Sequence, residues 1–88
     1  MKLLFCKDCS DVVKLQLFDR SCACGNSSGR YNADGDTCTV SGVSAVVIAI
    51  GNRSLFLGVL MQPETGEGPN LKAWVFAKDY HKINHVKH

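Results

Sequence analysis

The sequence lacks the features that mark several classes of protein. Only two of its residues are proline and 20% are charged, against 45% that are hydrophobic, which excludes a disordered or low-complexity chain. Its longest apolar run, Ala45 to Ile50, is far shorter than the ~20 residues that span a bilayer, and the opening run from Leu3 to Phe5 is too short for a signal peptide. We therefore expect a cytoplasmic protein, located in the host cytoplasm if a phage encodes it. Eighty-eight residues are too few to build two cores, so residues 1–88 are expected to form a single domain.

Catalytic motifs are also missing. Ser41 and Ser44 lie outside any G-x-S-x-G frame, and no glycine-rich phosphate-binding loop precedes a Lys-Ser or Lys-Thr pair. Cys38 falls within a predicted strand and is interpreted as a small buried hydrophobe. The three histidines of residues 81–88 lack the glutamate of H-E-x-x-H, which favours a solvated tail over a second metal site. We expect that the protein is not an enzyme.

Several short segments have the hydrophobic pattern of β-strands. Apolar and polar residues alternate along residues 13–17, and β-branched residues lie between turn signals at 37–40. Along residues 71–77 aliphatic residues alternate with lysine and aromatic residues, which predicts a strand with one aromatic face. The uniformly apolar run 45–50 predicts a strand that is covered on both faces. Residues 54–61 fit either a helix or a buried strand, with Gly58 favouring the strand. The expected fold is mainly β, with a metal-binding part over residues 3–33, a small antiparallel β core over 37–80 that has room for one short helix, and a flexible tail over 81–88.

Four of the five cysteines are arranged in two tight pairs. Cys6 and Cys9 form a C-x2-C pair, and Cys22 and Cys24 form a C-x-C pair after twelve intervening residues. Zn²⁺ prefers four ligands in a tetrahedron, and two tight turns that each offer two thiolates can complete this shell. Gly25 follows the second pair, where glycine most easily adopts the backbone that turns amides toward sulfur. The spacing predicts a closed, structural zinc site, and the alternatives are two disulfides, a redox pair or a four-thiolate iron site.

With these pairs, residues 3–33 resemble the zinc ribbon class of proteins. The resemblance implies two knuckles at the ends of short β-hairpins, with zinc held by Cys6, Cys9, Cys22 and Cys24. Two positions depart from the common pattern: the second knuckle is C-x-C where C-x2-C is commoner, and Ser10 stands where the first knuckle often has glycine. The segment from Cys24-Gly25 to Gly29-Arg30-Tyr31 is also similar to small zinc-ribbon proteins that bacteria and phages encode.

The C-terminal half contains a strand that is both aromatic and basic. Lysines at 72, 78 and 82 accompany Trp74, Phe76 and Tyr80, as on strands where single-stranded bases stack. The other interpretation is a face packed on the core, with lysines at its edge that prevent aggregation. The second interpretation is favoured because so short a chain has few other aromatic residues to bury.

The net charge bears on the choice of partner. The formal charge of +2 falls to about zero once four thiolates and one Zn²⁺ are counted, which weakens the case for nucleic acid. We therefore predict a non-enzymatic zinc-binding module that acts by protein–protein interaction, as a small effector or adaptor of phage type. The alternative is a nucleic-acid-binding zinc ribbon that uses Lys72, Trp74, Lys78 and Lys82. No membrane partner is expected, and the oligomeric state is left open.

Overall fold

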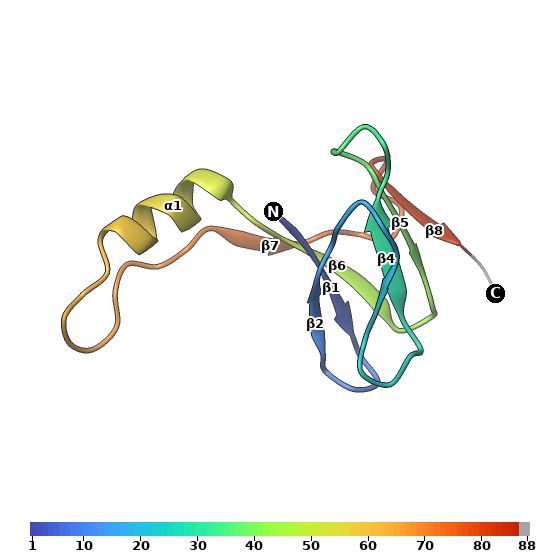
Figure 1. Cartoon of the computed structure of the whole chain (residues 1–88), viewed down its shortest axis with the longest axis horizontal. Helices are drawn as coiled ribbons and strands as arrows, with labels where there is room; N and C mark the ends of the chain where they lie inside the picture. Colours follow the sequence, from blue (N-terminus) through green and yellow to red (C-terminus); the bar gives the residue numbers. More distant parts are fainter. Residues whose placement is uncertain (87–88) are drawn as a thin grey trace.

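The chain folds into two four-stranded β-sheets and one short helix, and the computed structural model describes residues 1–86 (Figure 1). The first sheet has the strand order β2-β1-β6-β7, and these strands are Val12–Lys14, Lys2–Cys6, Ala45–Ile50 and Ala73–Val75. All three pairings in this sheet are antiparallel. The expected mainly β class is confirmed.

The second sheet has the strand order β3-β4-β5-β8, and these strands are Arg20–Ser21, Ser28–Tyr31, Cys38–Ser41 and Ile83–Val86. β8 runs parallel to β5, with Cys38 opposite Ile83. This strand corrects the expectation of a flexible tail over residues 81–88, of which 87 and 88 lie outside the described residues. The sequence gives no apolar pattern for this strand, because only Ile83 of β8 is buried. The strand is held by backbone hydrogen bonds, which do not depend on side-chain type.

The two sheets enclose an apolar core. On β6 the side chains of Ala45, Val47 and Ala49 are buried, and those between them are half-buried. β6 is therefore fully covered on one face, whereas its uniformly apolar sequence predicts cover on both. Strands of both sheets contribute to the core, which includes Leu4, Val13, Cys38, Val40, Val47 and Ile83.

The N-terminal segment is part of both sheets. β1 pairs with β6 from Lys2, opposite Ala49, to Cys6, opposite Ala45. β4 pairs with β5 in the second sheet, from Ser28 opposite Ser41 onward. The expected metal-binding part over residues 3–33 and the expected β core over 37–80 thus share their sheets, so the cysteines are positioned by the same strand pairings that hold the core.

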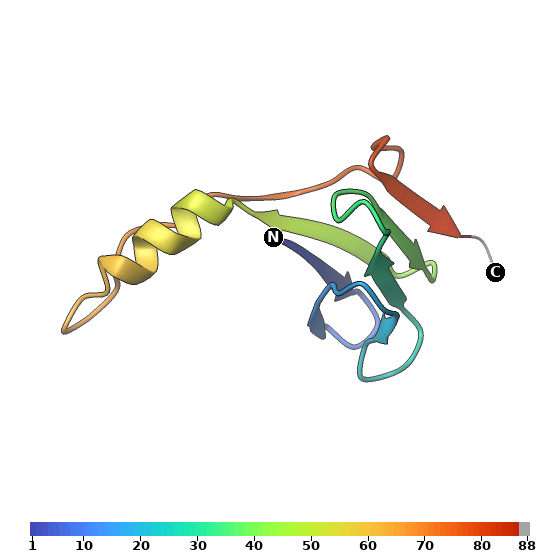
Figure 2. The same cartoon turned by 45° about the horizontal axis from the view of Figure 1, so that its top comes forward.

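Residues 52–72, here called the arm, project from the two sheets (Figures 1 and 2). The arm begins with the helix α1 (Asn52–Leu60), so the segment that fits either a helix or a strand on sequence grounds is helical. Its base is fixed by Lys72, whose N–H donates to the Ser54 hydroxyl at 2.7 Å and whose carbonyl accepts from Gly51 N–H at 2.8 Å. Among residues 1–86 no helix is long and apolar enough to cross a membrane.

Gly58 favours a strand on sequence grounds, yet it lies in α1 and has a packing role there. A Cβ at this position would come within 2.6 Å of Leu71 Cδ2. Glycine therefore leaves room for the Leu71 side chain to lie directly against the helix.

Gly42 offers a test of the packing between the sheets and the second cysteine pair. It has a φ of 109° in the turn between β5 and β6, and a Cβ there would collide with the carbonyl oxygen of Asn26. We expect Gly42→Ala to lower the free energy of unfolding by about 3 kcal/mol, because overpacking adds to backbone strain. Gly35→Ala is the control, since Gly35 has a φ of 70° with open space around it, and it should cost about 1 kcal/mol. Urea unfolding measures both, and equal losses would contradict the close approach.

Candidate metal centre

The first cysteine pair lies at the turn between β1 and β2. Cys6 is the last residue of β1, and its carbonyl accepts a hydrogen bond from Ser10 N–H at 2.8 Å, which closes the turn that contains Cys9. Ser10 has a φ of 60°, in the left-handed region that favours glycine. This explains why glycine is common at this position of a knuckle, and it shows that serine adopts the same backbone here.

The second cysteine pair lies between β3 and β4 and is built in a similar way. Gly25 has a φ of 78°, and its N–H donates to the Cys22 carbonyl at 3.0 Å. The backbone N–H of Ser27 points at the Cys22 sulfur, 3.3 Å away. Each pair therefore lies at the turn of an antiparallel strand pair, as the zinc ribbon resemblance implies.

Two polar contacts join the knuckles directly. The Asp11 carboxylate accepts a hydrogen bond from Ala23 N–H at 2.8 Å, and the Asn26 amide donates to the Asp8 carboxylate at 3.3 Å. These side chains have no metal-ligand spacing, so the sequence carries no signal for them. They hold the two turns face to face from outside the sulfur cluster.

The four sulfurs converge to the dimensions of a tetrahedral metal site. The Sγ atoms of Cys6, Cys9, Cys22 and Cys24 all lie within 4.8 Å of one another. The Cys6 and Cys22 sulfurs lie 3.7 and 3.5 Å from that of Cys24. Metal–sulfur bonds of ~2.3 Å in a tetrahedron place sulfurs about 3.8 Å apart, so the residues fit an ion of this kind. The sequence-predicted ligands are thus brought together, with Cys6 and Cys22 buried and Cys24 exposed.

The pKa values of two cysteines in the cluster are shifted in opposite directions. The Ser27 hydroxyl, helped by two backbone amides, lowers the pKa of Cys6 to about 6, although burial opposes the shift. The backbone N–H of Asn26 favours the thiolate of Cys24, but partial desolvation and the three other sulfurs outweigh it and raise the pKa of Cys24 to about 12. Charge on one sulfur thus opposes charge on the next. A cation among the sulfurs removes this conflict, because a coordinated thiol is deprotonated.

Ser27 is a site residue that no sequence motif marks. Its side chain is buried, and within residues 1–86 its hydroxyl oxygen makes no well-directed hydrogen bond. The hydroxyl lies near the Cys6 sulfur, where it is the largest influence on the Cys6 pKa. A buried hydroxyl costs free energy unless it has a partner, and a thiolate sulfur is the partner in reach.

The other candidates lie away from this cluster. Cys38 is fully buried in β5, and burial raises the pKa of its thiol, in keeping with a small core residue. Among the described residues, His81 lies against the Tyr80 ring and His85 belongs to β8, while His88 lies outside them. Over residues 1–86 the four cysteines form the one group of three or more metal-ligating side chains that could hold an ion.

The candidate nucleic-acid residues are only partly grouped. Trp74 on β7 is 44% exposed, and Lys72 and Lys78, which flank it in the sequence, are also exposed. Lys82 instead pairs with Asp36 at 2.8 Å. Phe76 and Tyr80 stack on each other, with ring centroids 4.7 Å apart, and pack against the core. Phe76 and Tyr80 thus pack on the core as expected, whereas Trp74 is exposed.

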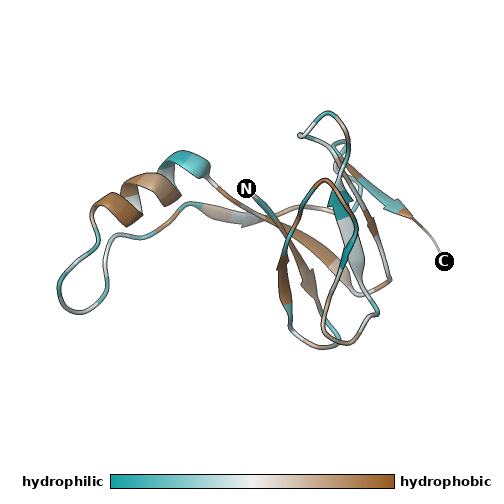
Figure 3. Ribbon diagram, viewed as in Figure 1, coloured by the Kyte–Doolittle hydropathy of each residue, from teal (hydrophilic) through white to brown (hydrophobic). Residues whose placement is uncertain are grey.

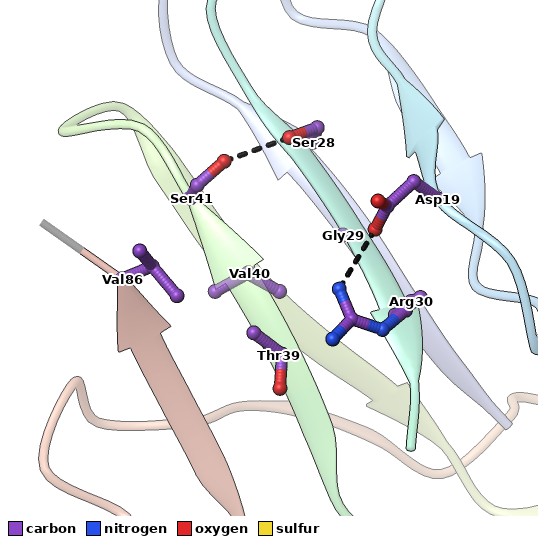
Figure 4. A pocket seen from close by; sticks show the side chains of 8 residues that line it. All are labelled: Asp19, Ser28, Gly29, Arg30, Thr39, Val40, Ser41 and Val86. Atoms are coloured by element: carbon purple, nitrogen blue, oxygen red, sulfur yellow. Dashed lines mark hydrogen bonds and ion pairs between the residues drawn. The ribbon is translucent and has the colours of Figure 1, made fainter. Parts of the chain in front are cut away.

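A shallow pocket on the second sheet has polar groups that are already paired. It is lined by β4, β5, Asp19 and Val86 (Figure 4). Arg30 forms an ion pair with Asp19 at 3.0 Å, and the hydroxyls of Ser28 and Ser41 are 2.7 Å apart. These groups satisfy one another across the pocket, so the cysteine cluster is the stronger candidate site.

Comparison of the chain with protein-family models, with curated proteins and with solved structures found no match.

Substitution of single cysteines tests the ligand set. We expect Cys9→Ser to abolish stoichiometric metal binding, because three sulfurs leave the tetrahedral shell incomplete. Cys38→Ser should leave the metal content unchanged, since Cys38 lies outside the cluster. Elemental analysis of the purified variants measures both. Metal lost from Cys38→Ser but retained by Cys9→Ser would mean that the ligand set is wrong.

Substitution of Ser27 tests its influence on the sulfur cluster. We expect Ser27→Ala to weaken metal binding by about tenfold, as removal of a group that supports a ligand typically does. Competition with a chromophoric chelator measures the affinity, and Ser28→Ala, on the neighbouring strand β4, is the control. Equal affinities for Ser27→Ala and the unsubstituted chain would exclude the contact with Cys6.

Proposed function

We propose that the chain is a non-enzymatic zinc-binding module, in which the zinc is structural and the protein acts by binding another protein. The observation that carries the proposal is the convergence of four cysteine sulfurs within 4.8 Å. Four thiolates complete a tetrahedral shell and leave no open position for a water molecule or a substrate, which is the mark of a structural site.

Zinc accounts for the four thiols better than the alternatives. The sulfurs of Cys22 and Cys24 are 3.5 Å apart, far from the ~2.05 Å of a disulfide bond. A redox C-x-x-C pair usually opens a helix, whereas here Cys9 is followed by the strand β2. Iron could be bound by the same four thiolates, so elemental analysis must distinguish the two metals.

The position of the cluster indicates what the zinc would do. Cys6 ends a strand of the first sheet, and Cys22 and Cys24 follow a strand of the second. A metal ion held by all four cysteines therefore ties the two sheets together at one end. Such a crosslink suits a chain of 88 residues, since domains of this size often need a metal or disulfides to supplement a small core.

Two properties support a protein as the partner. The metal-loaded chain has a net charge of about zero, since four thiolates and Zn²⁺ together offset the formal +2. The arm exposes apolar side chains that contribute nothing to the core, and exposed apolar patches mark interaction surfaces. Both fit a small effector or adaptor of the type that phages encode.

The alternative is nucleic-acid binding through Trp74, Lys72 and Lys78. Its support is the exposed indole ring, which two exposed lysines flank in the sequence. The pairing of Lys82 with Asp36 removes one of the four expected contacts. Affinity for single-stranded DNA that falls steeply with salt would favour this alternative, and no binding at low salt would exclude it.

The metal content tests the proposal directly. We expect protein purified under reducing conditions to contain one zinc ion per chain, bound by all four thiolates. Zinc by elemental analysis, combined with thiol titration before and after addition of a chelator, measures both the ion and its ligands: four thiols should become reactive on metal removal. A folded, metal-free chain with two disulfides, or a chain loaded with iron alone, would overturn it.

A further inference from the structure

The four cysteines of the cluster differ in how far solvent reaches them. Cys6 is fully buried at the end of the mostly hydrophobic strand β1 (Figure 3), and Cys22 is 5% exposed. Cys9 is half-buried and packs against the core. Cys24 is the one exposed member of the four. A reagent that approaches the metal centre from solvent therefore meets Cys24 first.

The tip of the second knuckle leaves this side of the cluster open. Residues 23–26 are all exposed, and a Cβ at Gly25 would have open space around it. The first knuckle is instead backed by the turn before β6, where Lys7 N–H donates to the Ser44 carbonyl at 2.9 Å. The two knuckles thus enclose the cluster unequally, and the second knuckle is the accessible side.

Access decides which sulfur of a metal-loaded cluster reacts. A coordinated thiol is deprotonated, and the thiolate is the nucleophilic form of cysteine. All four sulfurs are thiolates once a metal is bound, so their protonation no longer distinguishes them. Susceptibility to oxidation then follows exposure, which ranks Cys24 above the other three ligands.

Two further sulfurs lie next to that of Cys24, one from each knuckle. The Cys22 sulfur is 3.5 Å away and the Cys6 sulfur is 3.7 Å away. A disulfide bond joins sulfurs at ~2.05 Å, so a movement of about 1.5 Å brings either sulfur to bonding distance. An oxidised Cys24 therefore has a thiolate within reach on both knuckles.

We propose that the Cys24 sulfur is an oxidation site, at which a hydroperoxide opens the metal-loaded cluster and the metal is released. The inference rests on the proposed zinc centre. The Cys24 thiolate attacks the terminal oxygen of the hydroperoxide, so an S–O bond forms and the O–O bond breaks. The other oxygen leaves with the bonding electron pair and takes up a proton. The sulfur is oxidised by two electrons to a sulfenic acid, and the hydroperoxide is reduced to an alcohol or water.

A second thiolate completes the reaction. Cys22 or Cys6 attacks the Cys24 sulfur, so the S–S bond forms, the S–O bond breaks, and hydroxide leaves and is protonated to water. Two thiolates, one hydrogen peroxide and two protons thus give one disulfide and two water molecules. The cluster then has two thiolates instead of four, which leaves the tetrahedral shell incomplete.

Peptide mapping of the zinc-loaded chain tests the site of attack. The chain is treated with a limiting amount of hydrogen peroxide, unfolded with N-ethylmaleimide to block the remaining thiols, and digested with trypsin. Cys22 and Cys24 then lie on one peptide, residues 21–30, and the other three cysteines lie on separate peptides. The disulfide that forms should contain Cys24, as fragmentation of that peptide shows. Cys38, which is fully buried outside the cluster, should be recovered as a blocked thiol.

A matched pair of substitutions tests whether this sulfur controls metal release. Cys24→His and Cys9→His both keep four ligands, since three cysteines and one histidine form a common zinc shell. Under excess peroxide, Cys24→His should release zinc more than about tenfold more slowly than the unsubstituted chain, because its exposed ligand cannot be oxidised to a disulfide. Cys9→His retains Cys24 and should release zinc at the unsubstituted rate. A chromophoric zinc indicator measures the rates, and zinc content with circular dichroism shows that both variants are loaded and folded.

The outcomes separate this inference from the proposed function. A chain that holds one zinc but forms its first disulfide without Cys24 overturns the oxidation site and leaves the zinc module intact. Equal release rates from the two histidine variants also overturn the oxidation site. A chain without zinc overturns the zinc module and this inference with it. If a histidine variant does not hold zinc, the disulfide map of the unsubstituted chain decides alone.

Discussion

The convergence of four cysteine sulfurs at one end of two β-sheets is the constraint on which the rest of the structure depends. Cys6 reaches the cluster from β1, which pairs along its whole length with β6, while Cys22 and Cys24 reach it from the turn after β3. The sulfurs can meet only if the two sheets have a fixed relation at this end. Conversely, four crowded thiols oppose one another's ionisation, as the raised pKa of Cys24 shows, until a cation joins them. The sulfur cluster and the sheet packing are therefore set by the same strand pairings.

The two knuckles adopt the same kind of backbone turn although their residues differ. Ser10 and Gly25 both have positive φ values after their cysteine pairs, 60° and 78°. For serine this conformation costs about 1–2 kcal/mol relative to glycine, which the turn recovers in part through the Ser10 N–H bond to the Cys6 carbonyl. The second knuckle has one residue fewer between its cysteines and still brings its sulfurs into the cluster. Departures from the common pattern thus change the local energy and leave the ligand geometry in place.

The sequence predicts what is locally encoded and misses what depends on distant contacts. The two cysteine pairs were identifiable from spacing alone, because each lies in one tight turn. Strands such as β6 were identifiable from their apolar, β-branched residues. Ser27 and Asp11 could not be found, since their importance arises from contacts across the two knuckles. β8 is not evident from the sequence because a polar segment becomes a strand here through parallel pairing with β5, 45 residues earlier in the chain. The sequence of α1 fits either a helix or a strand, because its short apolar run matches the hydrophobic pattern of both.

The distribution of large apolar side chains links the metal centre to the arm. The buried core is built mainly from valine, alanine, leucine and cysteine, whereas Phe56, Met61 and Trp74 are exposed on or beside the arm. A chain of this length already buries a limited fraction of its surface, so side chains placed outside the core reduce its stability further. A metal ion held by the four thiolates would join both sheets and offset that loss without using apolar residues. A metal at this site would thus allow the arm to keep its apolar side chains at the surface.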